Sequence, residues 1–143
     1  MGKTTDELLN QLSNMKTISE LHSFTTDTEK SDYKLLFHEY ISEFVNASPL
    51  SVSEIIQKSR IPRTYGYQIL NGSRKPGRDK VISLCLTLSL SLKETQRALT
   101  IAKESILYPK NKRDSILIFS INKRLSVDDA NDLLYELNEK LIE

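Results

Sequence analysis

The chain has 143 residues and a net charge of +1, with 38% hydrophobic and 27% charged residues and a single cysteine. This length suits one domain, or a small domain with extensions, and it is enough to bury one core. One cysteine excludes an intramolecular disulfide, and no apolar run reaches the length that a membrane span needs. The N-terminus also lacks the apolar stretch of a secretory signal, so we expect a cytoplasmic protein.

The N-terminal segment predicts two short helices and a loop. The first helix is expected over 5–15, where three leucines share one side of a helical period: Leu8, Leu9 and Leu12. Thr17 followed by Glu20 is a capping box, in which each side chain accepts the other residue's amide, and it predicts a second helix start. The polar residues 25–31 predict a loop, so residues 1–30 are expected to form a helical extension.

A stronger amphipathic helix is expected over 32–46. Its apolar residues recur at intervals of three and four positions: Tyr33, Leu36, Phe37, Tyr40, Ile41, Phe44 and Val45. Shortly afterwards, Ser51 followed by Glu54 is another capping box. A new helix is therefore expected to begin at Ser51.

A proline and a glycine delimit the second helix of an expected helix pair. Pro62 disfavours helical backbone in the residue before it and suits a helix start, which predicts a helix over 62–71. Gly72 is placed for a left-handed helix end, and Pro76 prevents continuation. Polar side chains share one face of this helix: Arg63, Thr64, Tyr67, Gln68 and Asn71. Arginine and glutamine can make bidentate contacts with guanine and adenine edges, which indicates a face suited to reading bases.

The next stretch predicts two more helices. Residues 78–90 are apolar on nearly every side, which is typical of a buried central helix, and Cys85 is expected to be one of its buried residues. Ser91 followed by Glu94 is a further capping box and begins a helix that ends near residue 104.

The segment 113–143 predicts a helical hairpin. Its first helix is expected over 113–123, and the second begins at Ser126 and runs through Leu141. The hairpin holds more apolar residues than it can bury internally. The surplus is expected either to pack on the same chain or to join two copies in a homodimer. Because strand-like alternation is poor throughout, we expect an all-α protein.

Basic residues are concentrated on the helix pair. Residues 51–80 hold seven basic and two acidic side chains, whereas the first fifty residues hold four basic and eight acidic ones. A basic cluster beside a polar helix face is typical of nucleic-acid binding.

The stretch Leu50–Pro76, LSVSEIIQKSRIPRTYGYQILNGSRKP, resembles the helix-turn-helix of the phage-repressor-like, or XRE, family of bacterial transcriptional regulators. The resemblance has no gap here and extends more loosely over 32–92. It implies a five-helix repressor-like core within 31–106, with helix 62–71 as the recognition helix in the major groove of double-stranded DNA. It also implies base contacts from Arg63, Thr64, Tyr67 and Gln68, and phosphate contacts from Asn71, Ser73, Arg74 and Lys75.

The chain departs from the family's pattern at four positions. Ile56 stands where alanine is usual and Ser59 where leucine is usual. Arg60 replaces the glycine of the turn, and Gly66 replaces a bulky aliphatic residue. The alanine and the aliphatic normally face each other, so Ile56 and Gly66 together would conserve volume, and we expect them to pack against each other.

Two classes of function stay open. The first is a sequence-specific DNA-binding transcriptional regulator with an N-terminal extension (1–30), a helix-turn-helix domain (31–106) and a C-terminal hairpin (107–143). The second is a protein-interaction adaptor, such as an antitoxin or a partner of a signalling enzyme, which would use the acidic N-terminal residues and the hairpin.

Nothing in the sequence predicts an enzyme. We find no Gly-rich phosphate loop, no nucleophile elbow and no triad of catalytic residues. His22 and His38 lack neighbouring cysteines or clustered carboxylates at ligand spacing, so no metal or other cofactor is expected.

Overall fold

The computed structural model describes residues 5–13 and 35–143. In these residues all regular structure is helical, with eight helices and no strand, so the described protein is all-α as predicted. The chain divides into two compact units, 1–35 and 36–143. In the first, α1 (Thr5–Ser13) agrees with the expected helix. The helix expected from Thr17 and the loop 25–31 lie outside the described residues.

The second unit begins with α3 (Phe37–Ala47), which starts later than the expected residue 32. Leu36 has extended backbone, with φ −87° and ψ 152°, and caps this helix. Its amide donates to the Glu39 carboxylate at 3.4 Å, and this bond satisfies a free amide at the helix start. The expected residues 32–34 lie outside the described part of the chain.

The expected helix pair is present as α4 (Val52–Lys58) and α5 (Arg63–Asn71). The capping box at Ser51 is confirmed: its hydroxyl accepts the Glu54 amide at 3.2 Å, and the Glu54 carboxylate accepts the Ser51 amide at 3.1 Å. Pro62 is the N-cap of α5, so the helix begins at Arg63, one residue after the expected start. Gly72 ends the helix with φ 85°, the left-handed conformation that was predicted.

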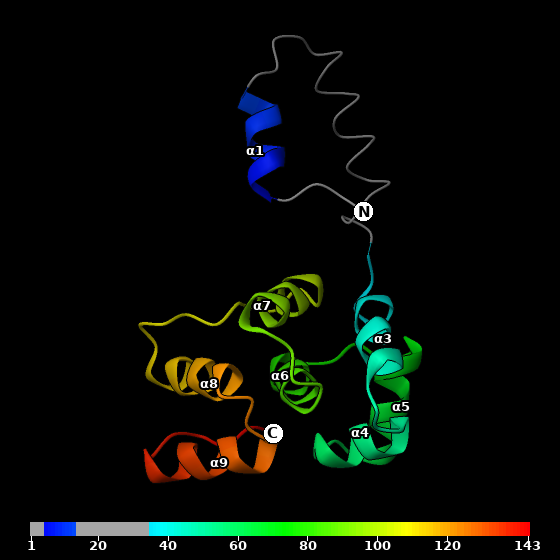
Figure 1. The fold of residues 1–143 in the computed structure, drawn as a ribbon, viewed down its shortest axis with the longest axis vertical. Helices are drawn as coiled ribbons and strands as arrows, with labels where there is room; N and C mark the ends of the chain where they lie inside the picture. The colour runs from blue at the N-terminus through cyan, green and yellow to red at the C-terminus, as the bar shows by residue number, and fades with distance from the viewer. Residues whose placement is uncertain (1–4, 14–34) are drawn as a thin grey trace. The chain divides into compact units, whose positions relative to one another are not determined.

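Helix α6 (Arg78–Thr87) is the centre of this unit, and its residues 81–86 are all buried. It packs against α4, α8, α9 and α7 (Leu92–Ile101), as Figure 1 shows. On the other side of the helix pair, α3 packs against α5 and α7. Cys85 is fully buried as expected, and burial raises the pKa of its thiol to about 12.

The hairpin is present as α8 (Lys112–Asn122) and α9 (Val127–Glu136), with one correction at its end. The second helix does not run through Leu141 but ends at Glu136. Asn138 adopts a left-handed φ of 60°, and the Glu139 amide donates to the Leu134 carbonyl at 2.8 Å. This is the hydrogen-bond pattern of a helix end, and residues 137–143 are accordingly non-helical.

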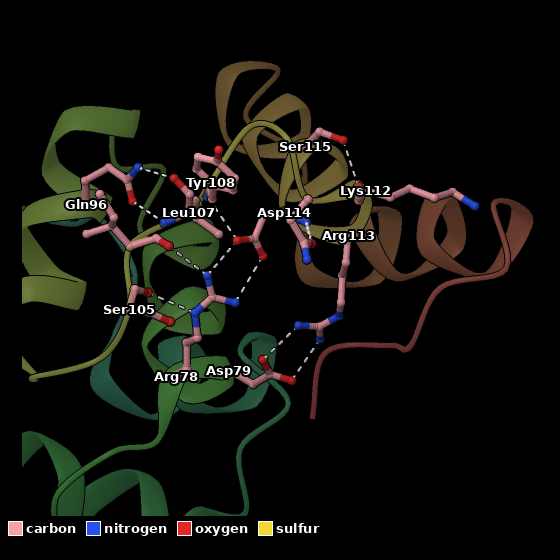
Figure 2. A network of polar contacts seen from close by, with 12 residues as sticks. Arg78, Asp79, Gln96, Ser105, Leu107, Tyr108, Lys112, Arg113, Asp114 and Ser115 are labelled. Atoms are coloured by element: carbon pink, nitrogen blue, oxygen red, sulfur yellow. Dashed lines mark hydrogen bonds and ion pairs between the residues drawn. The ribbon is translucent and has the colours of Figure 1, made fainter.

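Two arginine–aspartate pairs attach α8 to α6 (Figure 2). The Arg78 guanidinium binds both oxygens of Asp114, at 3.1 and 2.9 Å, and Arg113 binds both oxygens of Asp79, at 3.3 and 3.0 Å. Arg78 also donates to the carbonyls of Ser105 and Ile106. The hairpin is therefore joined to the central helix by polar contacts as well as by apolar packing.

Candidate nucleic-acid interface

Helix α5 has one buried side and one exposed side. Gly66 and Ile69 are buried. The four predicted base-contacting residues lie toward solvent: Arg63 and Thr64 are exposed, Tyr67 keeps 38% of its surface accessible and Gln68 is partly exposed. The structure thus brings the four side chains together on one accessible face.

Two of these side chains are organised by a contact with each other. The Arg63 guanidinium lies 5.7 Å from the centre of the Tyr67 ring, within the range of a cation–π interaction. Within residues 35–143, neither the Arg63 guanidinium nor the Gln68 side-chain amide makes a hydrogen bond. Their donors therefore remain available to a ligand.

The loop after α5 is shaped by its own hydrogen bonds. The Gln68 carbonyl accepts the amides of Ser73 and Arg74, at 3.0 and 3.2 Å. The Asn71 side-chain oxygen accepts the Ser73 amide at 2.8 Å, and the Ser73 hydroxyl donates to the Gln68 carbonyl at 3.4 Å. Asn71 and Ser73 thus fix the loop, while Arg74 and Lys75 supply its charge.

Gly72 is required at the base of this loop for two reasons. Its φ of 85° is strained for any residue with a side chain. A Cβ added at Gly72 would also lie 2.6 Å from the ring of His38 on α3. Helix α3 therefore packs directly on the turn that carries Arg74 and Lys75.

The Tyr65 ring contacts two cations, Arg74 and Lys80, and no pattern in the sequence predicted these contacts. The Arg74 guanidinium lies 4.3 Å from the centre of the Tyr65 ring, and the Lys80 ammonium lies 5.9 Å from it. The three residues come from α5, the following loop and α6. No helical or strand period relates them, so only the folded chain brings them together.

Two arginines of the predicted basic cluster are turned away from the interface. Arg78 is bound to Asp114 on α8. Arg60 in the α4–α5 turn donates to both oxygens of Asp128 on α9, at 2.9 and 2.5 Å, and this hydrogen bond lowers the pKa of Asp128. Across the described helices, the other basic residues of the cluster make no ion pair: Lys58, Arg63, Arg74, Lys75 and Lys80.

The unusual residues of the turn and helix pair have a structural basis. Arg60 stands where the family that residues 50–76 resemble usually has glycine. Its backbone adopts a left-handed φ of 60°, a conformation that glycine adopts more readily than other residues. A Cβ added at Gly66 would lie 2.5 Å from Ile56 Cγ2, which confirms that these two residues pack against each other.

Comparisons with known proteins identify no relative: no protein-family model, curated protein or solved structure matches this chain. Within residues 5–13 and 35–143, no group of three or more histidine, cysteine, aspartate or glutamate side chains is arranged to hold a metal ion. None of the described helices is long and apolar enough to cross a membrane.

Proposed function

We propose that this protein is a sequence-specific, double-stranded DNA-binding transcriptional regulator of the phage-repressor-like type. Helices α3–α7 form its five-helix helix-turn-helix core, and α5 is the recognition helix. The observation that carries the proposal is the exposed polar face of α5, which lies beside a loop whose two cations have no acidic partner among the described residues. Such a regulator would act on cytoplasmic DNA.

In this proposal α5 enters the major groove, which is wide enough to admit a helix. Arg63 offers the fork of donors that pairs with guanine, and Gln68 offers the donor and acceptor that pair with adenine. The cation–π contact with Tyr67 limits the rotamers of Arg63, so the Arg63 side chain loses less conformational entropy when DNA binds. Thr64 and Tyr67 complete the base-contacting face.

The loop after α5 supplies affinity that does not depend on sequence. Arg74 and Lys75 neutralise backbone phosphates and release counterions, which makes binding sensitive to salt. Asn71 and Ser73 keep the loop in place. The Asn71 side-chain nitrogen, which the loop does not use, would donate to a phosphate, and the Ser73 hydroxyl would exchange its long bond to the Gln68 carbonyl for one.

A homodimer through residues 113–143 is the second part of the proposal. One recognition helix reads only a few base pairs, and two copies spaced by one DNA turn gain affinity and specificity. The hairpin leaves four large apolar side chains accessible: Phe119 at 50%, Tyr135 at 76%, Leu137 at 45% and Leu141 at 40%. These residues are suited to contact a second copy.

Selection of bound duplexes from random DNA tests the proposal. We expect the protein to enrich one motif, and Gln68→Ala to lose about 1 to 3 kcal/mol of binding free energy on that motif and less on unrelated DNA. Lys75→Met is the matched control. It should weaken all sequences alike and lower the slope of log affinity against log salt by roughly one unit. Unchanged discrimination by Gln68→Ala would contradict the assignment of α5.

The alternative is a protein-interaction adaptor or an antitoxin-like partner. The same accessible apolar residues of the hairpin favour it, because large exposed apolar side chains mark protein contacts when they cluster. Selection that enriches no DNA motif at low salt, where phosphate contacts are strongest, would favour this alternative.

A further inference from the structure

We propose that Tyr65 is a positioning residue that holds Arg74 and Lys80 as a single clamp for a DNA backbone phosphate. The inference rests on the proposed function and extends it to Tyr65, which the sequence did not single out, and to Lys80, which the sequence placed in the basic cluster. The Tyr65 clamp consists of Tyr65, Arg74 and Lys80.

The geometry of the clamp is that of two cations on one aromatic ring. At 4.3 and 5.9 Å from the ring centre, both charged groups are within the range in which a ring attracts cations. Tyr65 lies on α5 and is only partly exposed, and its ring has fewer rotatable bonds than the flexible side chains that carry the two cations. The ring therefore limits the rotamers of both.

The charges of the clamp are not neutralised within the protein. Neither Arg74 nor Lys80 makes an ion pair with any described residue. The acidic neighbour of Lys80, Asp79, is already bound by Arg113 and by the amide of Glu143. With both cations within about 6 Å of the Tyr65 ring centre and neither paired with a carboxylate, the positive charge around this ring would attract an anion.

The surroundings leave space for such an anion. A depression of about 480 Å³ lies elsewhere, between α4 and α9. A second one, of about 380 Å³, lies beside Tyr65, and Arg74 is not part of its lining, which consists of Tyr65, Gly77, Arg78, Asp79, Lys80, Arg113, Lys140 and Glu143. A Cβ added at Gly77 would meet no atom within 4 Å. The second depression is thus open beside the ring. Three of its basic residues are paired with carboxylates, Arg78 with Asp114, Arg113 with Asp79 and Lys140 with Glu143, which leaves Lys80 as the basic lining residue with no ion pair among the described residues. In the proposed clamp, a backbone phosphate beside Tyr65 would be bound by Lys80 from this depression and by Arg74 from the loop after α5.

The test compares full-length variants on the motif selected with the wild-type protein and on unrelated duplexes. Tyr65→Leu removes the ring, and we expect it to weaken binding to all sequences by about fivefold to thirtyfold, the loss of two cation–π contacts. Tyr65→Phe keeps the ring face and should bind within about twofold of the wild type. Lys80→Met should lower the salt slope by about one unit. The ratio of affinities for the motif and for unrelated DNA should stay unchanged in all three.

Two control variants distinguish the clamp from a general effect of losing a tyrosine ring. Tyr67→Leu makes the same change two residues along α5 and should alter the motif preference instead. Tyr108→Leu changes an exposed tyrosine outside the interface and should leave affinity unchanged. Wild-type affinity in both Tyr65→Leu and Lys80→Met, or equal losses in Tyr65→Leu and Tyr65→Phe, would overturn the clamp while leaving the proposed function intact. Failure of the wild-type protein to bind any duplex would overturn the proposed function itself.

Discussion

Gly66 determines how closely α4 and α5 can approach each other. A glycine inside a helix costs about 1 kcal/mol relative to alanine, so its presence needs a compensating contact. The side chain of Ile56, which is 2% exposed, occupies the space that a larger residue at 66 would take. The distance between α4 and α5, the candidate recognition helix, therefore depends on this pair.

Exchanging the sizes of these two residues gives a direct prediction. Gly66→Ile alone should lower the free energy of unfolding by about 1 to 3 kcal/mol, because the added side chain overfills the interface. Ile56→Ala should largely rescue it. A double-mutant cycle measured by urea denaturation checks this, with a coupling energy well above zero as the expected result. Additive effects would mean that the pair does not act as one unit.

Five of the described helices end in a left-handed turn that is formed without a glycine. After α4, α6, α7, α8 and α9, the chain turns through a residue with positive φ that is not glycine: Arg60, Ser89, Lys103, Arg124 and Asn138. In each case the next amide returns to a carbonyl of the helix, as the Glu104 amide does to Leu99 at 2.9 Å. A residue with a Cβ is strained by about 1 to 2 kcal/mol in this conformation.

Lys103 offers the clearest test of that strain, since its side chain is exposed and makes no hydrogen bond or ion pair with the described residues. Lys103→Gly should raise the free energy of unfolding by about 1 kcal/mol and the melting temperature by about 4 °C. Lys93→Gly, the same change inside α7, should lower both because glycine is a poor helix former. Calorimetry on the two variants measures the contrast. A lower melting temperature for Lys103→Gly would contradict the prediction.

Asp114 links the first turn of α8 to α6. Burial raises the pKa of its carboxyl, but the hydrogen bonds from Arg78 and from the Tyr108 amide outweigh burial, and the net pKa is lowered. A carboxyl whose pKa is lower in the folded state stabilises that state above its unfolded pKa of about 3.9, and this contribution is lost as pH falls through the folded value.

Asp114→Asn should therefore destabilise the protein by about 2 kcal/mol at pH 6, because Arg78 loses its anionic partner in a site with little water. The difference between wild type and variant should be smaller at pH 3, because below about pH 3.9 the carboxyl of the unfolded chain is protonated, while that of the folded protein stays ionised to a lower pH. Urea denaturation at the two pH values measures both differences. An equal difference at both would show that the charge of Asp114 contributes nothing.

The second unit is stabilised across its whole length by contacts between the helix pair, α6 and the hairpin. Much of the hairpin's apolar surface is buried by this packing, since Ile116, Leu117 and Leu134 are buried. The intramolecular alternative therefore accounts for these residues, and the proposed dimer depends on the ones left accessible, above all Phe119 and Tyr135.

Light scattering on the full chain tests the dimer. At tens of micromolar we expect the mass of two copies, and the double variant Phe119→Ser with Tyr135→Ser should have the mass of one copy with an unchanged helical circular dichroism signal. Both side chains are at least half exposed, so their loss should hardly affect folding. A wild-type protein with the mass of one copy would remove the dimer from the proposal.

The sequence determined the local elements because their signals are local. Capping boxes at Ser51 and Ser91, the helix end at Gly72 and the buried run of α6 each depend on residues within one or two turns, and each was predicted correctly. The exposed polar face of α5 followed from helical period alone. The contact between Ile56 and Gly66 was also predicted, but from the resemblance of residues 50–76 to a family in which a small and a bulky residue face each other at these two positions.

Only the tertiary structure decided which charges remain free. Arg60, Arg78 and Arg74 all belong to the same basic cluster in the sequence. In the fold, however, Arg60 and Arg78 are bound by aspartates that lie 68 and 36 positions further along the chain. Tyr65 meets Arg74 and Lys80 because a turn and a loop bring three elements together. Pairings of this kind depend on how distant helices pack, and no local pattern of residues encodes that packing.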